Sequence, residues 1–151
     1  AALESLIARR GQIVVISSIA GFSPLVGRTA YAASKHALHG FFDSLRSELR
    51  GEGVDILLVC PSFIATGIES SALGGDGRML GAPRKTVGGE AKPDEVAQRI
   101  VGAAQARQRQ CLPALTARLA WWICRLIPRA YERLMLRRVG AEFDLSPRSP
   151  E

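Results

Sequence analysis

The chain has 151 residues and is 47% hydrophobic, which is enough length and apolar content to bury one core. Its three cysteines have no paired spacing, and their odd number argues against a disulfide framework and predicts a reducing, cytoplasmic compartment. The net charge of +6 comes almost entirely from residues 107–139, which hold eight arginines and one acidic residue.

The first half of the chain predicts a strand, a helix and a second strand. Residues 1–9 have the pattern of the end of a helix, and the β-branched run 11–16 predicts a strand buried on both faces. A helix is expected from Thr29, its N-cap residue, to about residue 50. Its apolar side chains follow helical spacing: Leu38, Phe41, Phe42, Leu45 and Leu49. Residues 54–60 predict a second buried strand, so the whole segment forms a βαβ unit with parallel strands.

The second half predicts a long loop and another helix. Residues 61–92 are rich in glycine, serine and alanine, and loops of this length often form functional lids. The apolar residues available to a bound substrate are Phe63, Ile68, Leu73, Met79 and Leu80. Pro93 predicts the first position of the helix that follows. The inward stripe of this helix is expected to contain Val96, Ile100, Val101 and Ala104.

Residues 107–139 predict a basic amphipathic helix that Pro128 divides in two. Its apolar residues at helical spacing are Leu115, Leu119, Trp122, Ile123 and Leu126. Three interpretations remain open: packing over a substrate cleft with solvated arginines, contact with a membrane surface, or nucleic-acid binding, which no recognised motif supports. Arg118 and Arg125 interrupt an apolar run that is already too short to cross a membrane.

Ser18, Tyr31 and Lys35 are the strongest candidates for chemistry. Residues four apart share a helix face, so the Lys35 ammonium can stand beside the Tyr31 phenol and favour its ionised form. A tyrosine placed in this way can act as a general acid or base. Ser18 follows the first strand, and its hydroxyl can hydrogen-bond an oxygen whose charge changes during a reaction. This set of groups suits hydride transfer to or from a carbonyl carbon.

The segment from residue 11 to about residue 68 resembles the catalytic half of the short-chain dehydrogenase/reductase family. The resemblance rests on the strand that ends in ISS, the YAASK helix and the PSFIAT segment. It implies that Ser18 orients the substrate, Tyr31 donates or accepts the proton, and Lys35 steadies the nicotinamide ribose of NAD or NADP. The YAASK helix looks like that of the dehydrogenase/reductase and 11β-hydroxysteroid-dehydrogenase-like branch, which implies a lipophilic alcohol or carbonyl substrate.

The segment after the second strand is similar to the P-G-x-x-x-T motif with which this family contacts its cofactor. By position, the cofactor-binding residues are Tyr31, Lys35, Pro61, Ser62, Ile64 and Thr66. The Ile64 backbone and Thr66 are expected to contact the nicotinamide carboxamide. Ser62 stands where the family has glycine, which leaves open how closely the backbone approaches the cofactor there.

The predicted fold is α/β, the C-terminal part of a Rossmann-like doubly wound parallel sheet followed by a helical extension. Residues 1–106 are expected to form the C-terminal half of the Rossmann domain, and residues 107–151 a basic amphipathic extension with a polar tail. No G-x-G-x-x-G follows a strand, so the N-terminal, cofactor-binding half is expected to be absent. We therefore expect a fragment that has no dehydrogenase activity alone.

An alternative from another class is a non-catalytic interaction or membrane-surface module. It would use the helix 29–50, which presents Ala33, Ala37 and Phe41 with few charges, together with the basic segment 107–139. In the family that the chain resembles, this helix forms the dimer interface, which implies a homo-oligomer and allows both roles to coexist. The two histidines, His36 and His39, lack a metal-ligand pattern, so no metal site is predicted, and both are expected at the helix surface or at an interface.

Overall fold

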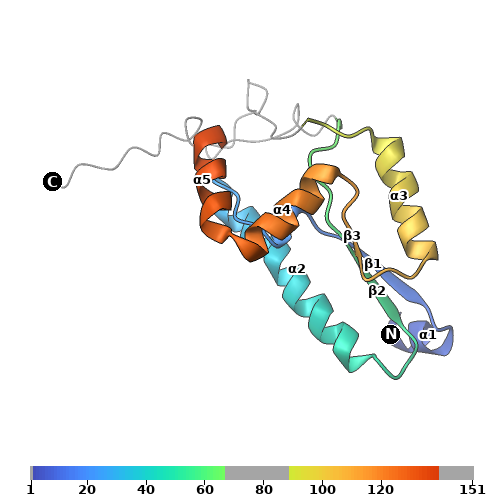
Figure 1. Cartoon of the computed structure of the whole chain (residues 1–151). Coiled ribbons are helices and arrows are strands. Elements are labelled where there is room, and N and C mark those ends of the chain that lie inside the picture. Colours follow the sequence, from blue (N-terminus) through green and yellow to red (C-terminus); the bar gives the residue numbers. More distant parts are fainter. Residues whose placement is uncertain (1, 67–88, 140–151) are drawn as a thin grey trace, which may run out of the picture.

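The computed structural model describes residues 2–66 and 89–139, and it shows a parallel sheet flanked by helices (Figure 1). The elements in chain order are α1 (Ala2–Ala8), β1 (Gln12–Ile16), the 3-10 helix η1 (Ile19–Gly21), α2 (Thr29–Glu48), β2 (Asp55–Val59), α3 (Pro93–Gln105), β3 (Gln110–Cys111), α4 (Leu115–Leu126) and α5 (Pro128–Val139). This order confirms the predicted α/β class, including the helical part at the C-terminal side.

The sheet has the order β1-β2-β3, and both pairings are parallel. Gln12 lies opposite Asp55 and Ile16 opposite Val59, so β1 and β2 are in register over their whole length. β3 adds a short third strand that places Cys111 opposite Val59. The predicted βαβ unit is therefore confirmed, and the carboxyl ends of β1 and β2 meet at one edge of the sheet, where open parallel sheets bind ligands.

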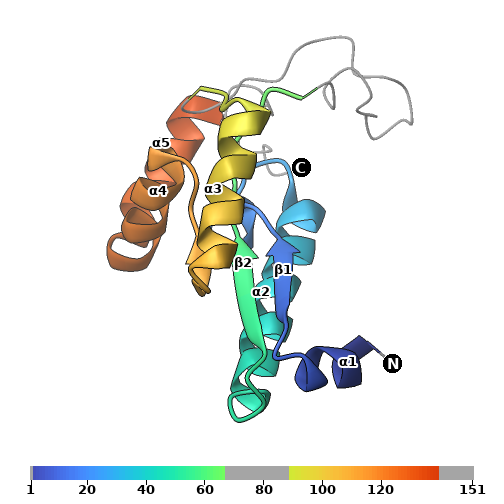
Figure 2. The same ribbon diagram turned by 90° about the vertical axis from the view of Figure 1, so that its right-hand side faces the viewer.

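Helices cover both faces of β2, with α3 in front of it and α2 behind it in Figure 2. The prediction that β1 is buried on both faces is wrong, because Val14 and Ile16 are exposed on the face opposite α2. The apolar cluster on the α3 side contains Leu57, Val59, Ala103 and Cys111. The cluster on the α2 side contains Val15, Ile56 and Leu58, with Leu38, Phe42 and Leu45 packed against it. Because β2 is buried on both faces, its sequence is a continuous apolar run, as the analysis of residues 54–60 predicted.

Three helix details refine or correct the prediction. Arg28, not Thr29, occupies the N-cap position of α2. Phe41, which the sequence placed both in the apolar stripe of this helix and on its partner-facing surface, is 63% exposed, because Phe42 packs against the sheet and adjacent helical residues point about 100° apart. Val101 was predicted to face inward but is 55% exposed, since the stripe that α3 turns to the sheet includes Ala103 in its place.

Strand β3 was not predicted, and it lies in the segment that the sequence analysis assigned to the extension. The Cys60 amide donates to the Cys111 carbonyl at 2.9 Å, and the Leu58 amide donates to the Arg109 carbonyl at 3.0 Å. A strand of two residues is too short to show a hydrophobic period, so only its pairing with β2 reveals it. The sheet therefore continues past residue 107 before the helical part begins.

Two helices follow the sheet, as predicted, and Pro128 begins the second of them. α4 packs with the face that contains Ala117, which is fully buried, and α5 with the face that contains Tyr131, Met135 and Val139. Four apolar residues of α4, which only one of the three open interpretations packed over a substrate cleft, are exposed within the described residues: Leu115, Leu119, Trp122 and Leu126. No helix in the described ranges is long and apolar enough to span a bilayer.

Candidate active site

Ser18 lies just beyond the end of β1 and caps the first turn of η1. Its backbone is extended, and its Oγ accepts a hydrogen bond from the Ala20 amide N–H at 3.2 Å. A hydroxyl that accepts in this way keeps its own proton for donation to another oxygen. Ser18 is therefore arranged as a hydrogen-bond donor at the carboxyl edge of the sheet.

Tyr31 and Lys35 lie in the first two turns of α2, on one side of the helix. The Lys35 ammonium nitrogen lies 5.7 Å from the centre of the Tyr31 ring. The same nitrogen donates a hydrogen bond to the Ile16 carbonyl at 3.3 Å, which links α2 to the last residue of β1. Tyr31 is 43% exposed, so its ring remains accessible. These contacts bring Tyr31 and Lys35 to the strand end that Ser18 follows.

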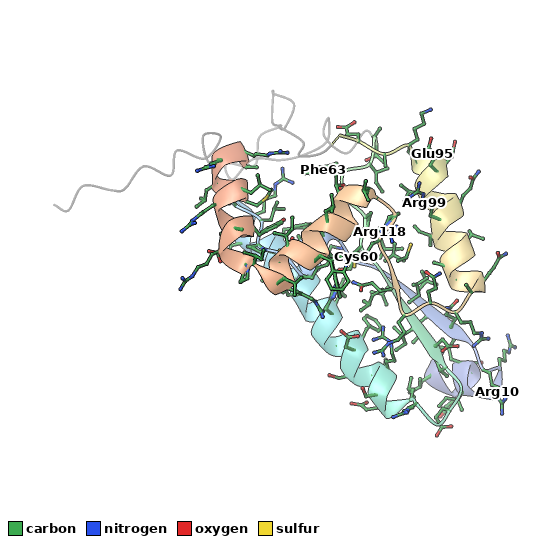
Figure 3. All side chains as sticks on the ribbon, viewed as in Figure 1. Arg10, Cys60, Phe63, Glu95, Arg99 and Arg118 are labelled. Carbon is green, nitrogen blue, oxygen red and sulfur yellow. The ribbon has the colours of Figure 1, made fainter. Side chains whose placement is uncertain are left out.

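The predicted cofactor segment leaves the neighbouring strand, β2, at the same edge. Figure 3 shows Cys60 and Phe63 along this segment, between α3 and α4. The Pro61 carbonyl accepts a hydrogen bond from the Ile19 amide at 3.1 Å, which holds the segment beside η1. Thr66 is exposed at the end of the segment. The four predicted substrate contacts beyond it lie outside the described residues: Ile68, Leu73, Met79 and Leu80.

Two backbone details of this segment matter for a ligand. Among the described residues, the non-glycine positions with positive φ are Arg10 and Arg107, so Ser62 has a conformation that any residue adopts. The serine therefore replaces the family's glycine without backbone strain. The Ile64 N–H donates none of the backbone hydrogen bonds that described residues form outside the helices and strands. That N–H can serve an external acceptor.

His39 faces inward and joins α2 to both strand ends. Its Nε2 lies 3.0 Å from Ser17 Oγ and 3.6 Å from Cys60 Sγ. Gly21 passes so close that a methyl group there would lie 2.5 Å from the same nitrogen. Both histidines were predicted at the helix surface or at an interface: His36 is exposed, whereas His39 is half-buried against Ser17 and Cys60 of its own chain. The four-residue spacing between Lys35 and His39 could have indicated the position of His39, because it puts both residues on the side of α2 that faces the end of β1.

Burial lowers the pKa of His39 below its ordinary value of 6.5, and the positive charges of His36, Arg125 and Arg46 act in the same direction, against Asp43. As the pH falls through about 6.5, the unfolded chain therefore takes up a proton before the folded chain, and stability decreases. We expect His39→Gln to reduce the acid-side loss in free energy of unfolding, measured by urea denaturation between neutral and mildly acidic pH.

The exposed histidine is a matched control for this prediction, because the chain contains only these two. His36→Gln is expected to leave the acid-side slope as in the unmodified chain. Equal slopes for both variants would show that His39 does not carry the pH dependence.

Helix α5 is tied to the loop that contains Ser18. The Tyr131 hydroxyl donates to Ser23 Oγ at 3.1 Å, and Ser23 donates in turn to the Ile19 carbonyl at 2.9 Å. Both side chains are buried, and burial raises the pKa of Tyr131, which keeps its phenol protonated as the donor. This pair could not be predicted from the sequence, since the two residues are 108 positions apart and neither belongs to a motif.

Comparisons with known proteins agree on one family. The family model for short chain dehydrogenases matches residues 1–74. The chain is 39% identical over 131 residues to dehydrogenase/reductase SDR family member 7B of Xenopus laevis, covering 86% of this chain and 41% of that protein. It is 36% identical over 140 residues to dehydrogenase/reductase SDR family protein 7-like of Anopheles gambiae, covering 91% of this chain and 44% of that protein. The chain thus spans less than half the length of these relatives.

Solved structures show the same fold. A short chain dehydrogenase from Burkholderia cenocepacia in complex with NADP matches with a TM-score of 0.72 and 18% identity, over 89% of this chain and 51% of that one. A short-chain dehydrogenase from Sphingobium yanoikuyae in complex with NADPH matches with a TM-score of 0.61 and 21% identity, over 98% of this chain and 51% of that one. These similarities confirm the Rossmann-like fold class.

Proposed function

Because the chain belongs to the short-chain dehydrogenase/reductase family, we propose that it forms the proton-transfer side of a site that interconverts an alcohol and a carbonyl group. The observation that carries the proposal is the position of Lys35. Its ammonium lies beside the Tyr31 ring and is also bonded to the end of β1, close to Ser18. This position supports the proposal because Lys35 links the helix that carries Tyr31 to the strand that Ser18 follows, at the carboxyl edge of a parallel sheet, where such folds bind substrates.

The three side chains have distinct tasks in this proposal. When a carbonyl is reduced, the Tyr31 phenol gives its proton to the carbonyl oxygen, and when an alcohol is oxidised the same atom takes the hydroxyl proton. The Ser18 hydroxyl donates a hydrogen bond to that oxygen, since accepting a bond from the Ala20 amide leaves its own proton available. Lys35 stabilises the negative charge that the phenol oxygen carries after it has released its proton.

A nicotinamide dinucleotide, NAD or NADP, is the cofactor that this proposal requires, and when bound it supplies the hydride half of the reaction. The residues present fit the nicotinamide end of such a group. Lys35 has donors beyond the one that it gives to Ile16, and the Ile64 N–H is available to a carboxamide oxygen. The other proposed contacts are Tyr31, Pro61, Ser62 and Thr66. The NADP and NADPH in the two solved structures are consistent with this assignment.

We propose a lipophilic substrate, in keeping with the branch that the YAASK helix resembles. Phe63 lies within the cofactor segment, is partly exposed and offers an apolar contact. The test is turnover of the full-length protein that contains this chain, with matched panels of lipophilic and water-soluble ketones and alcohols, followed by the absorbance of the reduced cofactor. Turnover confined to the water-soluble panel would contradict the substrate class, and turnover of neither panel would contradict the proposed reaction.

The chain is proposed to work as part of a longer protein. β1 is an edge of the sheet in the described residues, and its Val14 and Ile16 are 41% and 53% exposed although they alternate with buried Val15. The unpaired backbone edge of β1 favours pairing with a further strand, and the exposed apolar face favours cover by a further element. We therefore expect the isolated 151 residues to show no turnover with either cofactor, in contrast to the full-length protein.

Helix α2 is proposed to join two copies of the protein. Ala33, Ala37 and Phe41 follow one another at four-residue spacing on α2, and all three are exposed. Small residues around one aromatic ring allow two such helices to approach closely. Sedimentation velocity of the full-length protein should show a dimer that Phe41→Asp dissociates, and an unchanged dimer would place the interface elsewhere.

A further inference from the structure

Helix α4 carries an apolar stripe on its outer side. Leu115, Leu119, Trp122 and Leu126 are 68%, 53%, 58% and 69% exposed. Their spacing places them within one narrow sector of the helix. The opposite side contains Ala117, which is fully buried. α4 therefore packs with one face, and no residue in 2–66 or 89–139 covers its second, apolar face.

Positive charge borders this stripe. Arg118 and Arg125 lie on one side of the stripe, about 70° and about 90° from its centre, and both are exposed. Helix α5, which packs against α4, adds four exposed arginines at positions 129, 133, 137 and 138. None of these six arginines forms an ion pair with a residue that the structure describes. Arg118 is labelled on α4 in Figure 3.

We propose that α4 binds the surface of an anionic lipid bilayer, with the stripe entering the headgroup boundary and the arginines meeting lipid phosphates. Arginine matches phosphate oxygens in two parallel hydrogen bonds, and tryptophan is favoured at headgroup level. An apolar face flanked by arginines, with Glu132 as the one acidic residue in positions 107–139, is the composition of a helix that lies in a membrane interface. Charge complementarity favours an anionic bilayer as the partner, since α4 and α5 expose an excess of arginines and the bilayer surface carries many anionic headgroups.

Both tryptophans of the chain lie in α4, at positions 121 and 122, so their fluorescence reports on this helix alone. We expect the chain to float with vesicles of phosphatidylcholine and phosphatidylserine. We expect at least about tenfold weaker binding to pure phosphatidylcholine, since each arginine near an anionic surface contributes roughly 1 kcal/mol. High salt should weaken the binding to anionic vesicles, because salt screens surface charge.

A matched pair of substitutions locates the contact. Leu119→Glu and Val101→Glu make the same kind of change at positions that are 53% and 55% exposed, the first on α4 and the second on α3. We expect Leu119→Glu to reduce binding at least about tenfold, in line with a lost apolar contact and an added anion. Val101→Glu should bind as the unmodified chain does. Circular dichroism of both variants checks that each is folded.

Depth quenching tests the orientation without any disruptive substitution. Trp121→Phe leaves only the outward Trp122, and Trp122→Phe leaves only Trp121, which is half-buried and stacked by Arg125 at 4.2 Å. Brominated lipid should quench the first variant more strongly than the second. Equal quenching, or equal loss of flotation in the two glutamate variants, would overturn the proposal.

Failure to float with anionic vesicles would also overturn it. If sedimentation then shows a dimer that Leu119→Glu dissociates, the stripe is an interface between copies of this chain. Vesicle binding needs neither substrate nor cofactor, so its outcome is independent of the proposed oxidoreductase activity.

Discussion

Replacing Tyr31 by phenylalanine is expected to lower kcat/KM by about 10²–10⁴-fold, the usual contribution of a positioned general acid or base. The substitution removes one oxygen and keeps the ring beside Lys35, where the ammonium lies 5.7 Å from the ring centre. Cofactor affinity should change little, because Lys35 keeps its bond to the Ile16 carbonyl. Steady-state kinetics and cofactor titration of the full-length protein measure the two quantities separately.

The second tyrosine of the chain provides a matched control. Tyr131→Phe removes the hydroxyl that donates to Ser23 and should cost about 1 kcal/mol of stability while leaving most of the turnover. A Tyr31→Phe variant with near-normal turnover would contradict the proposed proton transfer. So would a loss in Tyr131→Phe as large as that in Tyr31→Phe.

Gly21→Ala is expected to destabilise the fold by about 1–3 kcal/mol, because it overpacks a tight junction. A Cβ atom at this position would lie 2.5 Å from His39 Nε2 and 2.6 Å from Ser17 Oγ, so these two side chains must shift and their contact at the end of β1 is disturbed. Ser18 directly follows Ser17, and the shift should therefore also reduce turnover. Urea denaturation measures the first effect and steady-state kinetics the second.

Gly40→Ala is the control, because the same methyl group at this position meets nothing within 4 Å. Gly40 lies inside α2, where alanine is favoured over glycine by about 0.5–1 kcal/mol, so this variant should be slightly more stable. If Gly21→Ala were as stable as the unmodified chain, the close junction of η1, His39 and Ser17 would be wrong.

Elements with a marked apolar pattern, or with a proline at the first helical position, could be predicted from the sequence. β2 is an unbroken apolar run because α2 and α3 cover both of its faces, and the strand bounds of 54–60 differ from the structure by one residue at each end. α3 begins at Pro93, as its fixed backbone angle favours. Pro128 divides the C-terminal helix pair at the predicted point.

Features that depend on a distant partner could not be predicted. β3 has two residues and is defined only by its bonds to β2. The outward direction of the α4 stripe depends on which face of the helix packs against α5 and η1, and the packed face contains the fully buried Ala117. Both faces follow the same helical period, so the sequence pattern alone does not distinguish them.

The candidate site also combines features that local sequence predicts with features that depend on a distant partner. The Tyr31 and Lys35 pair could be predicted because four-residue spacing fixes their common helix face. The direction of the Ser18 proton could not, because it depends on the Ala20 amide in the turn of η1. The links from His39 to Ser17 and from Tyr131 to Ser23 join separate elements, and no local pattern contains them.

Deuterium transfer tests the proposed reaction most directly. The full-length protein is given a lipophilic ketone and a reduced nicotinamide cofactor that carries deuterium on its reactive ring carbon, and the alcohol product is analysed by mass spectrometry. The proposal predicts deuterium on the former carbonyl carbon and a solvent-derived proton on the oxygen, with the yield largely lost in Tyr31→Phe. An unlabelled product, or equal labelled yields from the unmodified protein and Tyr31→Phe, would contradict the proton-transfer site formed by Ser18, Tyr31 and Lys35.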